Sequence, residues 1–174
     1  MAIHLDLPDS PRKLVFRRIV AQLRNDPTLS RALRTFQAWE GKPTDFQPLV
    51  QSNAPGIRLT PSCGPSLWAN PDAFRGWLYI DVDITVPGTD VADMLDLWWT
   101  IERAIYPPNP DRLEPSPALR FQRDLREAGI ARGIAGAYTG LVEFSQPAAD
   151  TSPGNQLMEA IGQMRVEMLL NLNT

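Results

Sequence analysis

The sequence predicts an α+β fold, a two-layer sandwich in which a mostly antiparallel sheet carries amphipathic helices packed on one face. Two observations near the middle of the chain lead to this class. Residues 76–86 alternate apolar and polar side chains, which is typical of a half-buried strand. Pro87 and Gly88 then end the strand, and Thr89 or Asp90 caps a helix.

That helix has apolar residues recurring every three or four positions, which predicts one buried face. The residues of this face are Val91, Met94, Leu95, Trp98, Ile101 and Ile105. A third observation is a second alternating segment over residues 134–146, which predicts another long strand. Strands and helices that each have one apolar face pack together as two layers around a common core.

The remaining elements are predicted from caps, breakers and periodicity. Asp9 or Ser10 caps a first helix that begins at Pro11, and residues 25–27 end it and cap a second helix that extends to Phe36. Further along the chain we expect a short strand over residues 57–61, a projecting loop over 62–75 that forms a hairpin insertion, a proline-rich connector over 107–117, a charged helix over 118–128, a loop over 147–154 and a C-terminal helix over 155–172.

The composition predicts one domain over residues 1–174 and gives no global attraction to nucleic acid or lipid. The chain has 174 residues, 43% of them hydrophobic, and a net charge of -3. Cys63 is the sole cysteine, so we expect neither an internal disulfide nor a cysteine metal cluster. We expect no signal peptide and no membrane span, and therefore folding in a reducing cytoplasm.

Few residues are suited to catalysis, and we expect no cofactor. His4 is the sole histidine, so zinc sites and histidine-based triads lack their usual components. A nucleophilic Cys63 would need a base, and only His4 is available. No glycine-rich turn resembles a phosphate loop, and no basic stripe with interleaved aromatics indicates nucleic-acid binding.

Asp81 and Asp83 are the best candidates for acid chemistry. Two positions apart on a strand, they lie on one face with side chains roughly 7 Å apart. Such a pair can hold a divalent ion or act in acid–base catalysis, which would suit a small metal-dependent hydrolase. The alternative is that both carboxylates lie on a solvated or pore-facing surface of the sheet.

Large aromatic residues exceed what a core of this size needs, which predicts contacts with other subunits or partners. Trp98 and Trp99 are about 100° apart on a helix, so one can pack inward while the other faces outward. The predicted interface residues are Leu67, Trp68, Phe74, Trp77, Tyr79 and Trp99. The basic residues Arg12, Arg17, Arg18 and Arg24 form either a solvated helix face or a patch that meets an acidic partner.

The segment GWLYIDVDITVPGTDVADMLDLWWTIERAIYP resembles the tail terminator (tail completion) proteins of long-tailed bacteriophages. In those proteins a long strand is likewise followed by a helix of the form D-x-x-x-L-x-x-x-I-x-x-A-I. Here that form is carried by Asp90 or Asp93, Leu97, Ile101, Ala104 and Ile105. The resemblance extends over residues 10–146 in pattern. The connector over 107–117 and the predicted C-terminal helix have no counterpart in it.

The resemblance implies a non-enzymatic structural protein of the virion, assembled in the host cytoplasm. Such proteins form a homo-oligomeric, hexameric ring on the head-proximal end of the tail tube. The ring contacts the tail tube protein and the head–tail connector, or neck, protein, and DNA passes through its lumen without specific binding. Asp81 and Asp83 would suit the lumen or a subunit interface, and residues 62–75 would suit a contact with the tube or a neighbour.

Other functions also fit the sequence. Another neck, head–tail joining or baseplate component would share the ring and differ in its binding partner. A hydrolase that uses Asp81 and Asp83 would bind a divalent metal stoichiometrically. A cytoplasmic adaptor that binds a ligand or a protein would stay monomeric.

Overall fold

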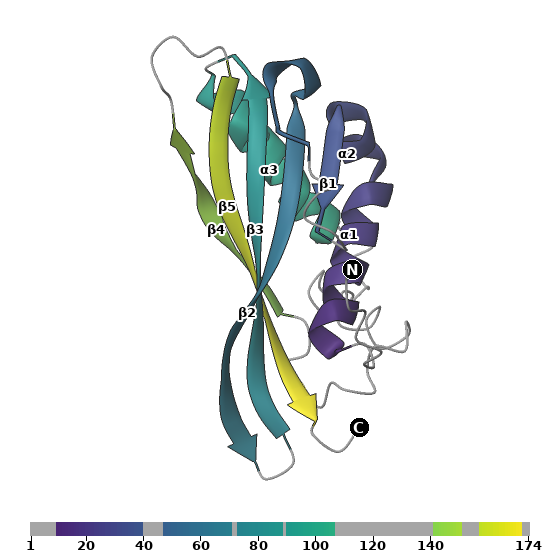
Figure 1. Cartoon of the computed structure of the whole chain (residues 1–174), viewed down its shortest axis with the longest axis vertical. Helices are drawn as coiled ribbons and strands as arrows, with labels where there is room; N and C mark the ends of the chain where they lie inside the picture. The colour runs from purple at the N-terminus through teal and green to yellow at the C-terminus, as the bar shows by residue number, and fades with distance from the viewer. Residues whose placement is uncertain are drawn as a thin grey trace, which may run out of the picture.

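The computed structural model describes residues 10–39, 47–70, 73–88, 90–106, 141–150 and 157–171, and these form one five-stranded sheet with helices beside it (Figure 1). The helices are α1 (Pro11–Asn25), α2 (Pro27–Ala32) and α3 (Val91–Ile105), with a 3-10 turn at Gln51–Asn53. The strands are β1 (Thr35–Ala38), β2 (Gly56–Asn70), β3 (Ala73–Pro87), β4 (Leu141–Asp150) and β5 (Leu157–Asn171).

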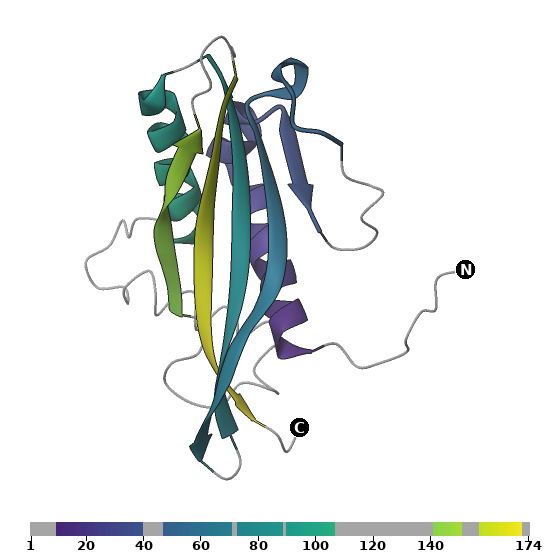
Figure 2. The same cartoon turned by 60° about the vertical axis from the view of Figure 1, so that its left-hand side comes forward.

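The strands lie in the order β1-β2-β3-β5-β4, and every pairing is antiparallel except that of β1 with β2. The helices cover one face of this sheet, with α3 beside β4 and with α1 toward the β1 side (Figure 2). The core lies between the two layers and joins α1 residues such as Ile19 to strand residues such as Ile80 and Met164. The predicted α+β class, with a mostly antiparallel sheet and helices packed on one face, is therefore confirmed.

The central strand and the helix after it follow the prediction closely. In β3 the alternating residues from Leu78 to Val86 are buried against the helices. Gly88 has a positive φ of 90°, which suits glycine in the turn. Asp90 is the N-cap of α3, and its side chain accepts a hydrogen bond of 2.8 Å from the Ala92 amide.

The caps of the first two helices are also as predicted, but the second helix is shorter. The Ser10 hydroxyl accepts a hydrogen bond from the Lys13 amide at the start of α1. Asp26 accepts hydrogen bonds from two backbone amides at the start of α2. The prediction of a helix up to Phe36 is wrong, because α2 ends at Ala32 and Phe36 lies in β1, paired with Ile57 of β2.

The predicted C-terminal helix over residues 155–172 is wrong, because residues 157–171 form strand β5. It pairs with β3 along its whole length, from Leu157 opposite Pro87 to Asn171 opposite Ala73. Its even-numbered residues from Met158 to Leu170 face the helices and are buried. Pairing on both sides, with β3 and with β4, satisfies the backbone of this apolar segment inside the sheet.

The loop predicted over residues 62–75 is replaced in its described part, residues 62–70 and 73–75, by two paired strands. The strand predicted over residues 57–61 continues as β2 to Asn70, and β2 pairs with β3 up to Asn70 opposite Ala73. The predicted hairpin insertion is thus the end of a long hairpin, which extends past the helices (Figures 1 and 2). Pro61 and Pro65 are tolerated because β1 pairs with β2 only as far as Leu59, so beyond it β2 is an edge strand among the described residues.

The strand predicted over residues 134–146 corresponds in part to β4, which extends to Asp150 and so replaces the start of the loop predicted over 147–154. The rest of that predicted strand, residues 134–140, lies outside the described residues. The same is true of the connector over 107–117, the charged helix over 118–128 and His4.

Candidate functional site: the open face of the sheet

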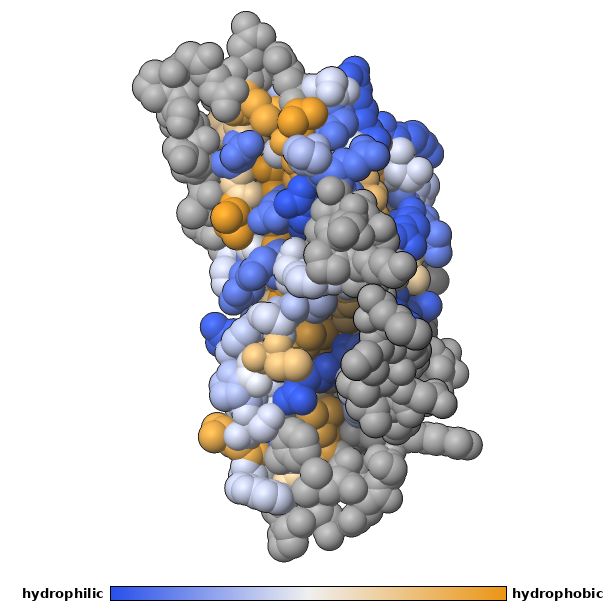
Figure 3. Space-filling model, in the orientation of Figure 1, coloured by the Kyte–Doolittle hydropathy of each residue, from blue (hydrophilic) through white to orange (hydrophobic). Residues whose placement is uncertain are grey.

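The sheet face turned away from the helices is a broad surface that no described element covers (Figure 2). On it lie the odd-numbered residues of β3 and β5, such as Asp81 opposite Gln163 and Tyr79 opposite Arg165. We call this surface the open face. In the same view as Figure 1, hydrophilic residues cover much of the coloured surface, and hydrophobic residues lie in groups between them (Figure 3).

Asp81 and Asp83 are both half-buried on the open face, and each has a different partner. The Gln163 side chain donates a hydrogen bond of 2.7 Å to Asp81 Oδ1. Arg58 Nη1 lies 3.7 Å from Asp83 Oδ2. Burial raises the pKa of Asp83 above its ordinary value, Arg58 opposes this rise, and the nearby charge of Asp81 adds to it.

Two further ion pairs extend this polar network across the strands. Arg165 of β5 places its guanidinium carbon 5.8 Å from the centre of the Tyr79 ring, and its Nη1 lies 3.4 Å from Glu143 Oε2 of β4. Nearer the hairpin end, Arg75 Nε lies 2.9 Å from Glu167 Oε1. Opposite charges on neighbouring strands favour this register of the sheet.

Trp77 and Tyr79, which were predicted to lie in an interface, are half-buried against their own chain. They pack over Gly64 of β2, beside the irregular register between Cys63 and Ser66. A Cβ at Gly64 would lie 2.8 Å from Trp77 Cβ and 2.9 Å from the Tyr79 ring. Glycine is therefore needed for these two aromatic side chains to lie across the strand.

The described residues offer no assembled centre for metal binding. Nowhere among them do three His, Cys, Asp or Glu side chains gather in a way that could hold a metal ion. Asp81 and Asp83 are neighbours on the open face, but each already contacts a polar side chain. Cys63 is exposed. As for membranes, α1 to α3 include no helix that is long and apolar enough to cross one.

Three of the predicted interface residues are strongly exposed. The exposed fractions are 59% for Leu67, 76% for Trp68 and 58% for Trp99. The first two lie near the tip of the hairpin, and Trp99 lies on the outer surface of α3. Phe74 belongs to β3, and its side chain is outside the described part of the structure.

The outer surface of α3 differs from the prediction in one respect. Trp98 is buried and Trp99 is exposed, so the predicted division of the two tryptophans is confirmed. Val91 and Leu95 were assigned to the buried face, and that assignment is wrong because both are exposed. Together with Trp99 they are spaced at i, i+4 and i+8, which puts all three on one side of the helix. This spacing was visible in the sequence as a separate stripe.

The four predicted basic residues all belong to α1 but have different environments. Arg12 is half-buried: its Nε donates to the Trp77 carbonyl at 3.1 Å and its Nη2 donates to Ser66 Oγ at 2.9 Å. Arg18 is also half-buried, whereas Arg17 and Arg24 are exposed. The guanidinium of Arg24 lies 5.3 Å from the centre of the Phe36 ring.

Comparison with known proteins assigns no family to this chain. No family model matches it, and no curated protein sequence matches it. Among solved structures, a chain from the "Virion of native gene transfer agent (GTA) particle" aligns with 87% of this chain and 91% of its own length, at 13% identity and a TM-score of 0.44. Similarity at this level identifies no function.

Proposed function

We propose that this chain is a structural subunit of a bacteriophage-type virion, specifically a tail terminator that forms a homo-oligomeric ring at the head-proximal end of a tail tube. The proposal starts from the resemblance of residues 76–107 to tail terminators. The strand, turn and helix on which that resemblance depends are present as β3, Gly88 and α3. The ring is a structural assembly, without catalytic activity.

One observation carries the proposal furthest: large apolar side chains are exposed on separate parts of the described surface. Leu67 and Trp68 lie at the hairpin end, and Trp99 lies on the outer surface of α3. A protein that binds one small ligand needs a single concave site. A subunit between a tube, a connector and its own copies needs several contact surfaces, and aromatic anchors are typical of such surfaces.

The open face is suited to the lumen of the ring. Its described side chains include more acidic groups than basic ones: Asp81, Asp83, Glu143, Glu159 and Glu167 against Arg58, Arg75 and Arg165. DNA binding depends on basic side chains that neutralise phosphates. A mildly acidic wall would let DNA pass without being held.

The test of the proposal is the assembly state of the full chain. Light scattering should give the mass of a multimer, and negative-stain images should show rings alone or on the ends of purified tail tubes. A chain that stays monomeric and leaves tube ends bare would overturn the proposal. Binding to isolated head–tail connectors but not to tubes would instead favour another neck component.

The lumen assignment has its own test in phage production. Replacing Asp81 and Asp83 by Lys should impair DNA passage and lower infectivity while rings still form. A control with Ser30→Lys adds positive charge to α2, on the helix side of the molecule, and should leave infectivity unchanged. Normal infectivity of the double variant, with rings intact, would contradict a lumen position for the open face.

A metal-dependent hydrolase is less well supported by the geometry. Asp81 and Asp83 are held by Gln163 and Arg58, and Arg58 brings a positive charge to the place where a cation would bind. Isothermal titration with Mg²⁺ or Mn²⁺ distinguishes the two functions, because a hydrolase would bind metal stoichiometrically and the Asp81→Asn variant would lose that binding.

A further inference from the structure

The helix α3 presents an exposed apolar stripe that no described part of the chain covers. Val91, Leu95 and Trp99 form it, and Trp99 has the largest exposed fraction of the three, 58%. The preceding residue, Trp98, is buried and packs edge-on against Phe144 of β4, with ring centres 6.0 Å apart. The helix that carries the stripe therefore lies beside β4, the strand at one edge of the sheet (Figure 2).

A pocket of about 380 Å³ lies on the other side of the molecule, near β1. Its apolar wall includes Phe16 of α1, Trp39 just after β1, and Pro61 of β2. Arg12, Lys13 and Arg17 of α1 also line it, so its rim is basic. This volume falls in the range of about 300–1,000 Å³ of pockets that receive small ligands, and it is enough for a large aromatic side chain.

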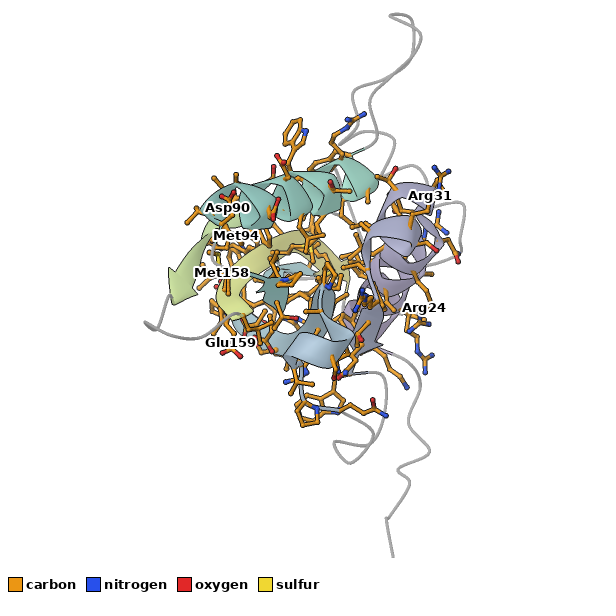
Figure 4. All side chains as sticks on the ribbon, turned by 90° about the horizontal axis from the view of Figure 1, so that it is seen from above. Arg24, Arg31, Asp90, Met94, Met158 and Glu159 are labelled. Carbon is orange, nitrogen blue, oxygen red and sulfur yellow. The ribbon has the colours of Figure 1, made fainter. Side chains whose placement is uncertain are left out.

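Charge is divided between these two sides of the fold. Residues 10–39, which include α1 and α2, contain seven basic residues and one acidic residue. Residues 90–106, which include α3, contain four acidic residues and one basic residue. Seen from above, Arg24 and Arg31 point outward on one side, and Asp90 and Glu159 lie on the opposite side (Figure 4). The net charge of the whole chain, -3, conceals this separation.

We propose that Trp99 of one copy of this chain inserts into the pocket between α1, β1 and β2 of a second copy. The acidic residues beside Trp99, Asp96 and Glu102, then face the basic rim at Lys13 and Arg17. An aromatic anchor in a pocket, surrounded by complementary charge, is the usual form of a strong interface contact. This inference rests on the proposed function, because it describes how the subunits of the ring meet.

The contact has a consequence for assembly. The inserting surface and the receiving surface are different, so each copy can give one and receive one. Such heterologous contacts form closed rings when the rotation between subunits closes, and filaments when it does not. Reciprocal insertion between two copies would instead give a closed dimer, and crosslinked species larger than dimers distinguish the ring from it. The hairpin tip, although it also exposes a tryptophan, has no comparable excess of acidic residues to match the basic pocket.

The first test uses two variants that each remove one half of the contact. Trp99→Ala removes the anchor, and Lys13→Glu with Arg17→Glu reverses the charge of the rim. Each variant alone should associate about 30-fold more weakly or worse, as measured by analytical ultracentrifugation, because loss of an anchoring aromatic has effects of this size. Mixed together, they should form a one-to-one complex, since one intact contact remains between the two kinds of chain.

Circular dichroism of each variant provides the folding control, and Trp68→Ala provides a matched loss of an exposed tryptophan elsewhere. We expect Trp68→Ala to keep the association between copies. If the Trp99→Ala variant forms rings as the wild type does, this inference is overturned and the proposed function stands. That outcome would assign the pocket to another occupant, such as the chain's own N-terminal residues. A monomeric wild-type chain that never forms rings on tubes would overturn both.

A second test uses the sole cysteine of the chain. Cys63 is exposed and lines the pocket. Arg103→Cys adds a thiol one helical turn beyond Trp99, and mild oxidation should then give a ladder of crosslinked multimers larger than dimers. The same substitution with Cys63→Ser should abolish the ladder. Crosslinked species no larger than dimers, or a disulfide within one chain, would contradict the proposed contact.

Discussion

Replacing Gly162 by Ala should destabilise the protein through a single steric conflict between β5 and α3. A Cβ at Gly162 would lie 2.4 Å from both Cη2 and Cζ3 of Trp98. Carbon atoms in ordinary contact are about 3.5–4.0 Å apart, so one side must move by about 1 Å. The β5 backbone is paired with β3 and β4, and the Trp98 ring is buried against Phe144, so neither side moves freely.

Overpacking of this kind costs about 1–3 kcal/mol in the free energy of unfolding. For a chain of this length, a loss of 1–3 kcal/mol corresponds to a fall in Tm of about 2–12 °C. Urea denaturation followed by circular dichroism measures the loss. Ile161→Ala is the matched control, because Ile161 is the adjacent residue on the open face, is exposed, and should change stability by about 0.5 kcal/mol or less.

The steric conflict between Gly162→Ala and Trp98 can be tested by repeating the substitution in a Trp98→Phe background. Phenylalanine lacks the part of the indole ring that the new Cβ would meet, so the added methyl should cost less there. The coupling between the two positions should be about 0.5–3 kcal/mol, as is usual for residues in contact. An equal cost of Gly162→Ala in both backgrounds would refute the assignment of the strain to Trp98.

Further predictions concern three single side chains. Tyr106→Phe should lower the free energy of unfolding by about 1–3 kcal/mol in urea denaturation. The reason is that the Tyr106 hydroxyl donates a hydrogen bond to the Val142 carbonyl at 2.7 Å and accepts one from the Val142 amide at 2.8 Å. A variant as stable as the wild type would show that other hydrogen bonds replace these two. In the wild type, burial raises the pKa of Tyr106 to about 12, so ultraviolet titration should show a phenol that ionises near pH 12. Asp26→Ala removes the cap of α2, and thermal unfolding should show a loss of about 0.5–2 kcal/mol, whereas Asp26→Asn should keep most of the stability. In the folded protein the pKa of Asp83 is raised above 3.8, so the folded protein binds the carboxyl proton of Asp83 more tightly than the unfolded chain does. The contribution of Asp83 to stability is therefore greatest below pH 3.8 and falls as the pH rises through the folded-state pKa. The stability of Asp83→Asn relative to wild type should therefore increase as the pH rises above 3.8, and no such change would contradict the raised pKa.

The sequence was most informative where local signals agreed with one another. In β3 and α3, strict alternation, the turn at Gly88 and the cap at Asp90 all indicate the same boundaries, and the structure has them. Ser10 and Asp26 likewise specify helix starts through hydrogen bonds within a few residues. Signals of this kind depend on neighbours in sequence, so the tertiary structure does not override them.

The C-terminal segment shows why the rest was harder to predict. Leu157, Ile161, Met164 and Met168 are spaced as on a helix, and Met, Leu, Gln and Glu are good helix formers. The even-numbered residues from Met158 to Leu170 form the alternating apolar pattern of a strand. Ala160 and Gly162 interrupt this pattern because their side chains are too small to stand out as apolar. Pairing with β3, about 80 residues away in sequence, decides the structure. Gly162 was the available clue, since glycine inside a helix costs about 1 kcal/mol relative to alanine.

The candidate site was predictable in its position but less so in its contacts. Placing Asp81 and Asp83 on one face needed only the period of the strand, and that placement is correct. Their partners come from strands distant in sequence, Gln163 on β5 and Arg58 on β2. Because residues 155–172 were assigned to a helix, Gln163 could not be predicted as a partner of Asp81. The same incorrect assignment hid the contacts that Arg165 and Glu167 make on the open face.

Arg12 connects the two regions where contacts with other proteins are proposed. Its guanidinium binds the Trp77 carbonyl of β3 and Ser66 of β2, and it also lines the pocket beside α1. Gly76 leaves room for it, because a Cβ there would lie 2.6 Å from Arg12 Nη2. The hairpin that carries Leu67 and Trp68 is thus attached to the first turn of α1 through one side chain. In the proposed interface a neighbouring subunit that enters the pocket would contact the same guanidinium that binds the hairpin, and we expect Arg12→Ala to weaken contacts between copies as well as the attachment of the hairpin to α1.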